Sequence, residues 1–522
     1  LEASEIDQTQ YICNGNSSNI AIPISSSNNT MLTSITPPTS NLNCDAGGRV
    51  ISHGLDNGDA GGIYANGVLE SGEVDTSITF CSHWVTGLVK DINSGSGSSS
   101  IYGFTAVGNT FYFTADDGIY GVELWKSDGT ASGTVMVKDI NSGSGYSNPD
   151  YLAAVGSTLY FEAYDTTNGR ALWKSDGTAS GTVMVKDIYS GSDTSSPLDD
   201  LTAVGNTLYF EAYDTTNGSE LWKSDGTASG TVMVKDINSG SGDSSPDQLT
   251  AFGNTLYFSA INGANGAELW KSDGTASGTV MVKDIWSGSG SSYPDDFTVI
   301  GNTLYFEAND GVNGEELWKS DGTASGTVMV KDINSGSVSS YPQYLTAVGN
   351  TLYFSAINGA NGYELWKSDG TASGTVMVKD INSGSPGSWS EELTAVGNTL
   401  YFKANDGTNG YELWKSDGTA NGTVMVKDIR SGSSHSYPSE ITAIGNTLYF
   451  SASDGINGYE LWKSDGTANG TMIVKDINSG SGGSDLKDLI FFGNTLYFRA
   501  NDGYSGNELY FDGFVETEIT YS

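Results

Sequence analysis

The chain is poor in the residues that most enzymes use for catalysis. It has 3 histidines and 3 cysteines in 522 residues, and His53, His83 and His435 lie far apart. No Ser/His/Asp, Cys/His or zinc-type spacing surrounds them. Basic residues are also scarce, because 62 acidic residues against 23 Lys and Arg give a formal net charge of −39. We therefore expect a protein that is not an enzyme and that does not bind nucleic acid, whose phosphates would be repelled.

Long apolar runs are missing as well. No stretch approaches the ~18 residues that a membrane-spanning helix needs, so we expect no membrane span. Cysteine is confined to Cys13, Cys44 and Cys81, all near the start of the chain. This distribution is typical of an extracytoplasmic module with one disulfide and one unpaired thiol. We expect a protein that is extracellular or at the cell surface.

A tryptophan-containing repeat fills most of the chain. Trp recurs at spacings of 48 or 49 residues, and Tyr510 continues the series after the last Trp, which gives nine units. The repeated tryptophans are Trp125, Trp173, Trp222, Trp270, Trp318, Trp366, Trp414 and Trp462. A fixed period of this length is typical of solenoids and propellers. We expect these rings to pack between neighbouring units.

Each unit contains four runs with strand character, which we name A to D. Around Trp414 they cover residues 393–397, 399–404, 411–417 and 423–429, separated by Gly- and Asn-rich turns and followed by a Ser/Gly/Pro segment. A four-stranded unit cannot cover both of its own faces, whereas radial stacking on neighbouring units can. We therefore predict an all-β fold, a nine-bladed β-propeller of four-stranded blades. A β-solenoid is the main alternative.

The order of the strands predicts how the ring closes. Residues 85–92 form an isolated D strand ahead of the first complete unit, and the last unit supplies only strands A, B and C. An N-terminal strand would therefore complete the ninth blade, and the propeller would span residues 85–513. The tail, residues 514–522, is then either a competing D strand or a strand for another partner.

The repeated segment Glu-Leu-Trp-Lys-Ser-Asp-Gly-Thr resembles the ELWxxDGT repeats of large microbial secreted and surface proteins. The resemblance implies an extracellular, non-enzymatic repeat protein. Ala171 replaces the motif Glu in the second unit, and Tyr510 replaces Trp in the last. A function that needs nine identical Glu sites is therefore not expected.

Residues 44–84 form a different unit, and its core resembles the small Cys-flanked GLDxNGNGVLxxxEV-like modules of bacterial surface proteins. This resemblance pairs Cys44 with Cys81 in a disulfide and leaves Cys13 outside it. Asn66, Gly67 and Glu73 hold the relative spacing of positions 5, 6 and 12 of a calcium loop. Asp56 and Asp59 would supply early ligands to this calcium ion, the one cofactor that we consider. A purely structural turn rich in Asn and Asp is the alternative, because an insertion at residues 58–65 breaks the standard spacing.

The start of the chain repeats the second half of this module. Residues 1–13 align without gaps on residues 69–81, so residues 1–15 are interpreted as half of a truncated module, followed by a Ser/Asn/Pro-rich linker at 16–43. The chain is either a fragment of a longer array or is completed by another molecule. Because residues 515–521 resemble residues 74–80, we predict head-to-tail self-association by strand exchange.

The connections between strands differ in how much they vary. The AB and CD turns hardly change, whereas the DA and BC connections vary and would open on one face of a propeller. Aromatic residues on these variable connections are candidates for contact with a protein or a glycan. They are Tyr120, Tyr146, Trp286, Tyr293, Tyr341, Trp389, Tyr437 and Tyr504. Neutral drift in solvent-exposed loops would explain the same variation.

Five Asn-X-Ser/Thr sequons permit glycosylation, at Asn16, Asn28, Asn217, Asn421 and Asn469. Nine near-copies favour scaffolding or multivalent binding over catalysis, which needs one asymmetric group of residues. The leading hypothesis is an extracellular structural or adhesive protein, as a surface filament subunit assembled through the N-terminal module and the C-terminal tail. The alternative is a multivalent lectin that uses the variable aromatic loop face.

Overall fold

The structure is a computed structural model, and it describes residues 30–37, 48–56, 68–69, 71, 73–189 and 198–519. These residues form strands, turns and loops, and among them no helix is long and apolar enough to cross a membrane. The chain divides into two units, one formed by residues 1–87 and 512–522 and the other by residues 88–511. Two strands, β3 (Thr76–Lys90) and β38 (Asn507–Ile519), run from one unit into the other.

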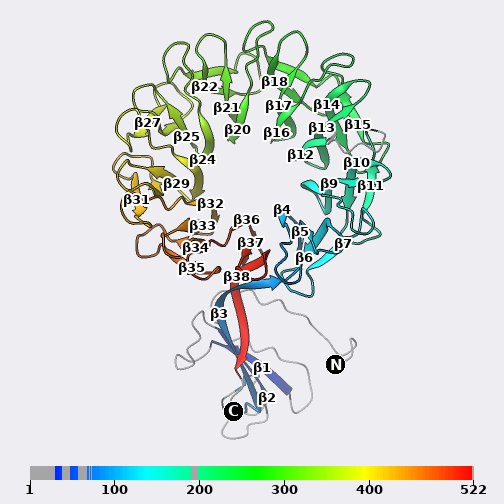
Figure 1. Ribbon diagram of the computed structural model, residues 1–522, viewed down its shortest axis with the longest axis vertical. Coiled ribbons are helices and arrows are strands. Elements are labelled where there is room, and N and C mark those ends of the chain that lie inside the picture. The colour runs from blue at the N-terminus through cyan, green and yellow to red at the C-terminus, as the bar shows by residue number, and fades with distance from the viewer. Residues whose placement is uncertain are drawn as a thin grey trace. The chain divides into compact units, whose positions relative to one another are not determined.

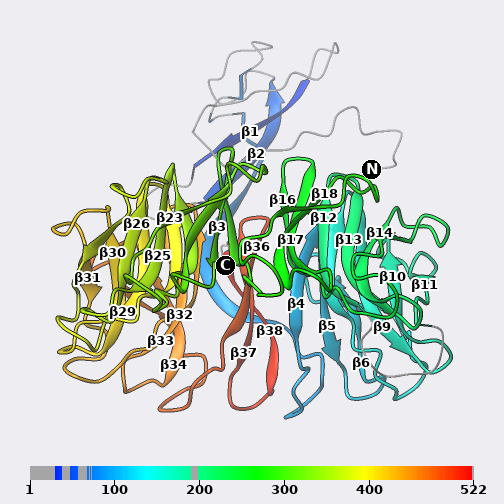
Figure 2. The same ribbon diagram turned by 90° about the horizontal axis from the view of Figure 1, so that it is seen from above.

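Residues 88–511 are built from repeated four-stranded antiparallel sheets arranged as in a β-propeller (Figure 1). The first sheet consists of β4 (Tyr102–Val107), β5 (Thr110–Asp116), β6 (Val122–Ser127) and β7 (Val135–Lys138). These strands are A, B, C and D of the sequence repeat. Strand A lies nearest the centre of the ring and strand D at its outside (Figure 1). Figure 2 shows the strands running between two rims where the connections lie.

Seven further sheets repeat this order. Their strands are β8 (Asp150–Val155), β9 (Thr158–Asp165), β10 (Gly169–Ser175) and β11 (Val183–Lys186); β12 (Leu198–Val204), β13 (Thr207–Asp214), β14 (Gly218–Ser224) and β15 (Val232–Lys235); β16 (Asp247–Phe252), β17 (Thr255–Ile261), β18 (Ala267–Ser272) and β19 (Val280–Lys283); β20 (Asp295–Ile300), β21 (Thr303–Asn309), β22 (Glu315–Ser320) and β23 (Val328–Lys331); β24 (Gln343–Val348), β25 (Thr351–Ile357), β26 (Tyr363–Ser368) and β27 (Val376–Lys379); β28 (Glu391–Val396), β29 (Thr399–Asn405), β30 (Tyr411–Ser416) and β31 (Val424–Lys427); and β32 (Ser439–Ile444), β33 (Thr447–Ser453), β34 (Tyr459–Ser464) and β35 (Met472–Lys475).

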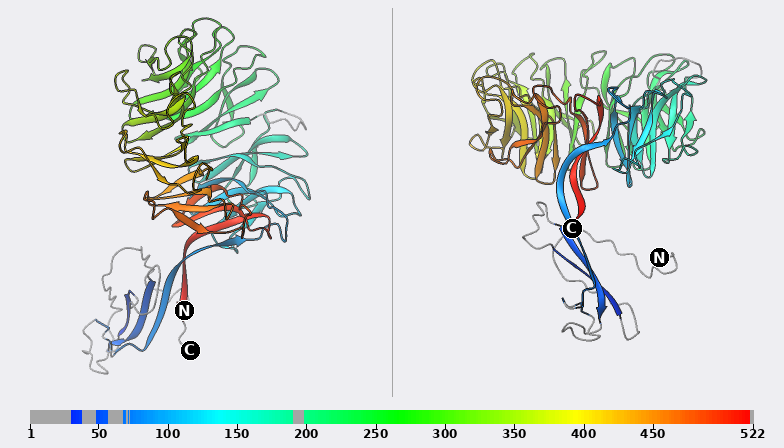
Figure 3. Two further views of the ribbon diagram at one scale, coloured as in Figure 1. Left: turned by 60° about the vertical axis from the view of Figure 1, so that its left-hand side comes forward. Right: turned by 60° about the horizontal axis from the view of Figure 1, so that its bottom comes forward.

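The last sheet combines both ends of the chain. Its order is β1-β2-β3-β38-β37-β36, with β36 (Lys487–Phe492) and β37 (Thr495–Asn501) as the last strands A and B. β38 supplies strand C, and β3 lies beside it in the place of strand D (Figures 1 and 3). The isolated D strand predicted at residues 85–92 therefore pairs with the C-terminal unit, although β3 begins earlier, at Thr76.

The apolar cores lie between consecutive sheets. In one core, Tyr353, Leu365 and Val378 of one sheet pack against Phe402 and Trp414 of the next. Strand B is therefore buried on both faces, as the pattern of β25 shows, whereas the outer strand β27 has one buried residue, Val378. Strand B is covered in this way because a neighbouring sheet lies on each side of it.

Lysine and tyrosine side chains reinforce each interface. Lys138 Nζ donates a hydrogen bond to Thr182 O of the next sheet at 2.8 Å and lies 5.6 Å from the ring centroid of Trp173. Lys126 Nζ donates to Gly177 O at 2.8 Å. A Cβ on Gly177, whose φ is +86°, would lie 2.5 Å from the hydroxyl of Tyr112, so only glycine fits there. Through these contacts each sheet is held to the CD turn of the next sheet.

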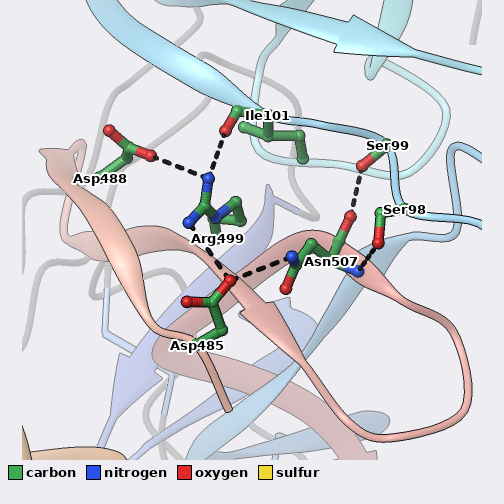
Figure 4. Close-up of polar contacts among 7 residues, drawn as sticks. All are labelled: Ser98, Ser99, Ile101, Asp485, Asp488, Arg499 and Asn507. Atoms are coloured by element: carbon green, nitrogen blue, oxygen red, sulfur yellow. Dashed lines mark hydrogen bonds and ion pairs between the residues drawn. The ribbon is translucent and has the colours of Figure 1, made fainter.

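The same interface joins the last sheet to the first. Val89, Ile92, Tyr497 and Leu509 form one core with Phe111 and other residues of the first sheet. Lys90 Nζ donates to Thr134 O at 2.7 Å. Figure 4 shows the polar side of this junction, where Arg499 donates to Ile101 O and Asn507 exchanges hydrogen bonds with Ser98 and Ser99. Residues about 400 positions apart therefore repeat the contacts of ordinary neighbours.

The N-terminal residues differ from the predicted linker at 16–43. β1 (Thr30–Thr36) lies within that segment and pairs antiparallel with β2 (Gly48–Asp56), which pairs in turn with β3. The side chain of Leu32 is fully buried. A short Thr- and Ile-containing segment is stable as a strand here because β2 offers it a partner edge.

We predict that β3 stabilises the last sheet as much as an internal D strand does. The double substitution V89A and I92A removes buried side chains and should cost several kcal/mol, since burying Ile instead of Ala is worth about 2–5 kcal/mol. The matched pair is V137A and I140A, at the equivalent positions of β7, and the exposed Val135 serves as a neutral site for V135A. A melting temperature that falls for V137A/I140A but not for V89A/I92A would contradict this role of β3.

Candidate functional site

The DA and BC connections form one surface, which we call the loop face. A Cβ on Gly118, in the BC connection of the first sheet, would lie 2.6 Å from Asn93 Oδ1 in the DA connection before it. A Cβ on Gly121 would lie 2.8 Å from the carbonyl oxygen of Gly145 in the DA connection after it. This BC connection therefore lies between two successive DA connections, and the two kinds of connection share one face, as predicted.

A buried glutamate anchors the DA connection in eight of the units. Glu123 is fully buried and accepts hydrogen bonds from the backbone N–H of Ile140 at 2.9 Å and from Ser147 Oγ at 2.6 Å. Because Ile140 begins the connection and Ser147 lies near its end, one carboxylate fixes both. Eight units carry this glutamate, as Glu123, Glu220, Glu268, Glu316, Glu364, Glu412, Glu460 and Glu508. Ala171 takes its place in the second unit.

Burial perturbs the ionisation of these glutamates. Desolvation raises the pKa of Glu412 to about 7, against the opposing effect of the hydrogen bonds from Ser436, Ile429 and Arg430. The pKa values of Glu123, Glu316, Glu364, Glu460 and Glu508 are raised to about 7 for the same reason. A raised pKa means that the folded state holds the proton more tightly than the unfolded state. Stability should therefore fall as the pH rises from about 4.5 toward 7.

Asx turns shape the BC connections. Asp454 Oδ1 accepts hydrogen bonds from the backbone N–H of Ile456 and Asn457, both at 2.8 Å. This turn pushes the intervening side chain outward, so that Ile456 is 73% exposed. The same position exposes Ile119, Val312 and Tyr504. The sequence prediction found only Tyr504 at this position, although a bulky apolar residue directly after the turn glycine was the available signal.

All eight predicted aromatic residues are exposed, which confirms their surface position. The exposed fractions range from 36% for Trp286 to 80% for Tyr504. Trp286 is the least exposed because its ring covers Gly311 of the next BC connection, where a Cβ would lie 2.4 Å from the indole. Their role in binding stays a prediction. The tryptophans of the repeat are instead buried between sheets, as predicted.

The residues predicted for the N-terminal module are described only in part. Asp56 and Glu73 are buried, and a Cβ on Gly54 would meet the backbone carbonyl of Glu73. Asp59, Asn66 and Cys44 lie outside the described residues, and Cys81 lies in β3. Within the described part of the chain, no group of three or more His, Cys, Asp or Glu residues is placed to hold a metal ion. Calcium binding and the disulfide stay predictions.

The sequons differ in accessibility. Asn421 and Asn469 are exposed in CD turns, whereas Asn217 is half-buried and its amide donates to Asp214 Oδ2 at 2.8 Å. A glycan on Asn217 would replace one of the two amide hydrogens that face Asp214. Asn16 and Asn28 lie outside the described residues.

No family model matches the chain, and a search of the curated proteins finds no match. Similar solved structures include a puromycin hydrolase, with 12% identity, a TM-score of 0.38 and coverage of 80% of this chain and 60% of that one. Prolyl oligopeptidase B from Galerina marginata matches at 11% identity and a TM-score of 0.38, over 78% of this chain and 55% of that one. Oligopeptidase B from Leishmania major matches at 10% identity and a TM-score of 0.38, over 67% and 53%.

The chain thus spans little more than half the length of these structures. Likeness at this level carries no argument about fold or function. The peptidase and hydrolase names are those of the matched proteins. The arrangement of the sheets, and not the comparison, identifies the propeller-like architecture of residues 88–511.

We predict that the buried glutamates make folding stability depend on pH. E412Q keeps the shape of the side chain but cannot ionise, so the loss of stability between pH 5 and pH 8 should shrink, by on the order of 2 kcal/mol. Chemical unfolding at several pH values measures this. E412A is the matched control: it removes the acceptor and should lower stability at every pH. An unchanged pH slope in E412Q would show that Glu412 does not titrate in this range.

Proposed function

We propose that this protein is a non-catalytic, extracellular adhesion module, and that residues 88–511 with β3 and β38 form a closed nine-bladed propeller. The closure rests on the core that Val89 and Ile92 share with the first sheet, and on the bond from Lys90 to Thr134. Closure would cover both faces of every sheet and leave only short strand edges exposed. The ring serves as a rigid frame for the loop face.

The single observation that carries the adhesive role is that the DA connections are held by the same glutamate in eight units but expose side chains that differ from unit to unit. The glutamate that holds the DA connection is the same in eight units, and its hydrogen bonds repeat with almost the same lengths. The side chains at the exposed ends of the same connections change from unit to unit, and many are aromatic. A constant scaffold that exposes varied aromatic side chains is typical of a binding surface.

The repeated architecture also argues against catalysis. Glu412, whose pKa is raised, accepts hydrogen bonds from the backbone N–H of Ile429 and from Ser436 Oγ, both in its own DA connection. Its perturbed pKa therefore has a structural cause, and we assign it no catalytic role. Catalysis would need one asymmetric group of residues.

We predict that adhesion depends on the loop face and not on the outer strands. Replacing the eight aromatic residues of the loop face by Asn should abolish retention of protein-coated beads on cells or on extracellular matrix material under flow. The matched control replaces eight exposed apolar residues at the starts of D strands by Thr: Val135, Val183, Val232, Val280, Val328, Val376, Val424 and Met472. Equal loss of retention in both variants, or none in either, would overturn the assignment of the loop face.

Self-association through the edge strand β1, in place of the predicted head-to-tail exchange of the tail, is a second proposal. β1 ends the sheet order, so among the described residues its outer edge has no neighbouring strand. The tail is a poorer donor than the sequence predicted, because β38 continues to Ile519 beside β3 and the rings of Trp84 and Phe514 lie 4.3 Å apart. To be donated, the tail would first have to leave β3.

We therefore predict association that survives removal of residues 514–522 and is lost when residues 1–37 are removed. Sedimentation velocity over a range of protein concentrations measures both. Melting temperatures of the two truncated proteins show whether residues 88–511 stay folded. Monomers after removal of the tail alone would instead restore the tail as the donated strand.

A further inference from the structure

One position in the DA connection takes a left-handed backbone in every unit where it is described. Its φ lies between +40° and +50°. Four units hold small or polar residues there, Ser100, Asn148, Ser245 and Asp485. Four consecutive units hold aromatic residues, Tyr293, Tyr341, Trp389 and Tyr437.

An aromatic residue is a costly choice at such a position. Positive φ is tolerated by Asn and Asp much better than by bulky side chains, whose Cβ approaches the backbone. The first, second, fourth and ninth DA positions show that the loop forms without a ring: Ser100, Asn148, Ser245 and Asp485 each accommodate the same φ. Strain that the fold does not require is often kept for function.

Strand residues extend these rings into a larger cluster. Tyr363 begins β26, and its ring centroid lies 4.6 Å from that of Trp389 at an interplanar angle of 34°. Tyr411 begins β30 and stacks on Tyr437 at 5.4 Å and 23°, and His435 lies 4.8 Å from Tyr437. In both units the backbone N–H of the loop residue donates to the carbonyl of the strand residue. We call Tyr293, Tyr341, Tyr363, Trp389, Tyr411 and Tyr437 the aromatic arc.

The arc lies at the surface and not in a core. Tyr293 is 63% exposed, Trp389 44% and Tyr437 42%. Exposed rings that stack on each other in pairs still present a flat apolar surface to solvent. The burial of the repeat tryptophans shows that this fold buries aromatic residues where its stability needs them.

The tips of the DA connections that carry the arc contain few charged residues. Segments 286–294, 334–342, 382–390 and 430–438 consist of Ser, Gly, Asn, Pro, Val and aromatic residues, with His435 and Arg430. Acidic residues flank these tips, and the chain as a whole carries −39; Asp284, Asp332, Asp380 and Asp428 come just before them, and Lys403 Nζ lies 5.8 Å from the ring centroid of Tyr411. A partner that matches the tips has flat apolar faces for the rings and hydroxyl groups for the Ser and Asn side chains.

We propose that the aromatic arc binds a neutral polysaccharide, with successive sugar rings against successive aromatic side chains of neighbouring sheets. This inference rests on the proposed adhesive function of the loop face and names its partner. Arrangement around the ring, at one equivalent position in each sheet, suits a chain of repeated sugar units. A basic peptide is the competing partner, because acidic residues flank these loops, whereas an acidic polymer would be repelled by the net charge of the chain.

The test replaces two rings by the residue that the chain itself uses at this position. In W389N/Y437N, the affinity for a soluble neutral polysaccharide, taken from a panel of glucan, mannan, galactan and dextran, should fall at least about ten-fold. The melting temperature should stay the same or rise, because Asn tolerates positive φ better than Trp or Tyr. S245N is the matched control at the equivalent position without a ring, and it should bind as the unchanged protein does.

Salt dependence separates the alternatives. Binding to the neutral polysaccharide should change little between about 0.05 and 0.5 M NaCl, because no ion pairs are involved. No binding to any member of the panel, or undiminished binding by W389N/Y437N, would overturn the inference. Salt-sensitive binding to polylysine or polygalacturonate, instead of to a neutral polysaccharide, would also overturn the inference. If adhesion still depends on the loop face in those cases, the proposed function stands and only the polysaccharide assignment fails.

Discussion

The structure depends on the fact that none of its sheets can bury its own faces. A four-stranded sheet of this length is stable only when apolar neighbours cover both sides, and here each neighbour is a copy of the same sheet. The core residues of strand B, such as Phe402, are therefore fully buried although no helix covers them. Lys138 and Lys126 donate hydrogen bonds to the next CD turn, and Tyr112 packs against Gly177 of that turn, so that neighbouring sheets keep a fixed register. Every other feature, including the spacing of the loops, follows from this repeated interface.

The interface divides each repeat into strand residues that pack against neighbouring sheets and loop ends that face solvent. The strands and the buried glutamate repeat because a change there would affect two sheets at once. The ends of the DA and BC connections lie at the surface, so their side chains change without cost to the cores. A departure within a strand needs compensation: in the last unit the buried Asp512 stands where other units have Ser, and its carboxylate accepts hydrogen bonds from Thr86 and Trp84. The variation among the loops is thus at a surface that a partner can reach.

Much of this architecture could be predicted because repetition turns weak local signals into strong ones. The strand expected at residues 399–404 is β29 (Thr399–Asn405), and the strand expected at 411–417 is β30 (Tyr411–Ser416). The pairing of the N-terminal D strand with the last sheet followed from counting strands. The left-handed backbone at Trp389 and Tyr437 could not be predicted, since aromatic residues rarely adopt it. β1 was missed because its stability comes from β2 and not from its own pattern. The raised pKa of Glu412 could not be predicted either, because it depends on burial between sheets.

The pairing of β3 with β38 has a mechanical consequence. Trp84 lies near Phe514 while Ile92 lies near Glu508, so the two strands run in opposite directions and both chain ends leave residues 88–511 from the same sheet. A tension applied between the two ends therefore acts first on this one pair of strands. The other eight sheets lie on the chain between the two strands and carry no load while the pair holds. An adhesive protein pulled through its termini would in this way protect its loop face from force until β3 and β38 separate.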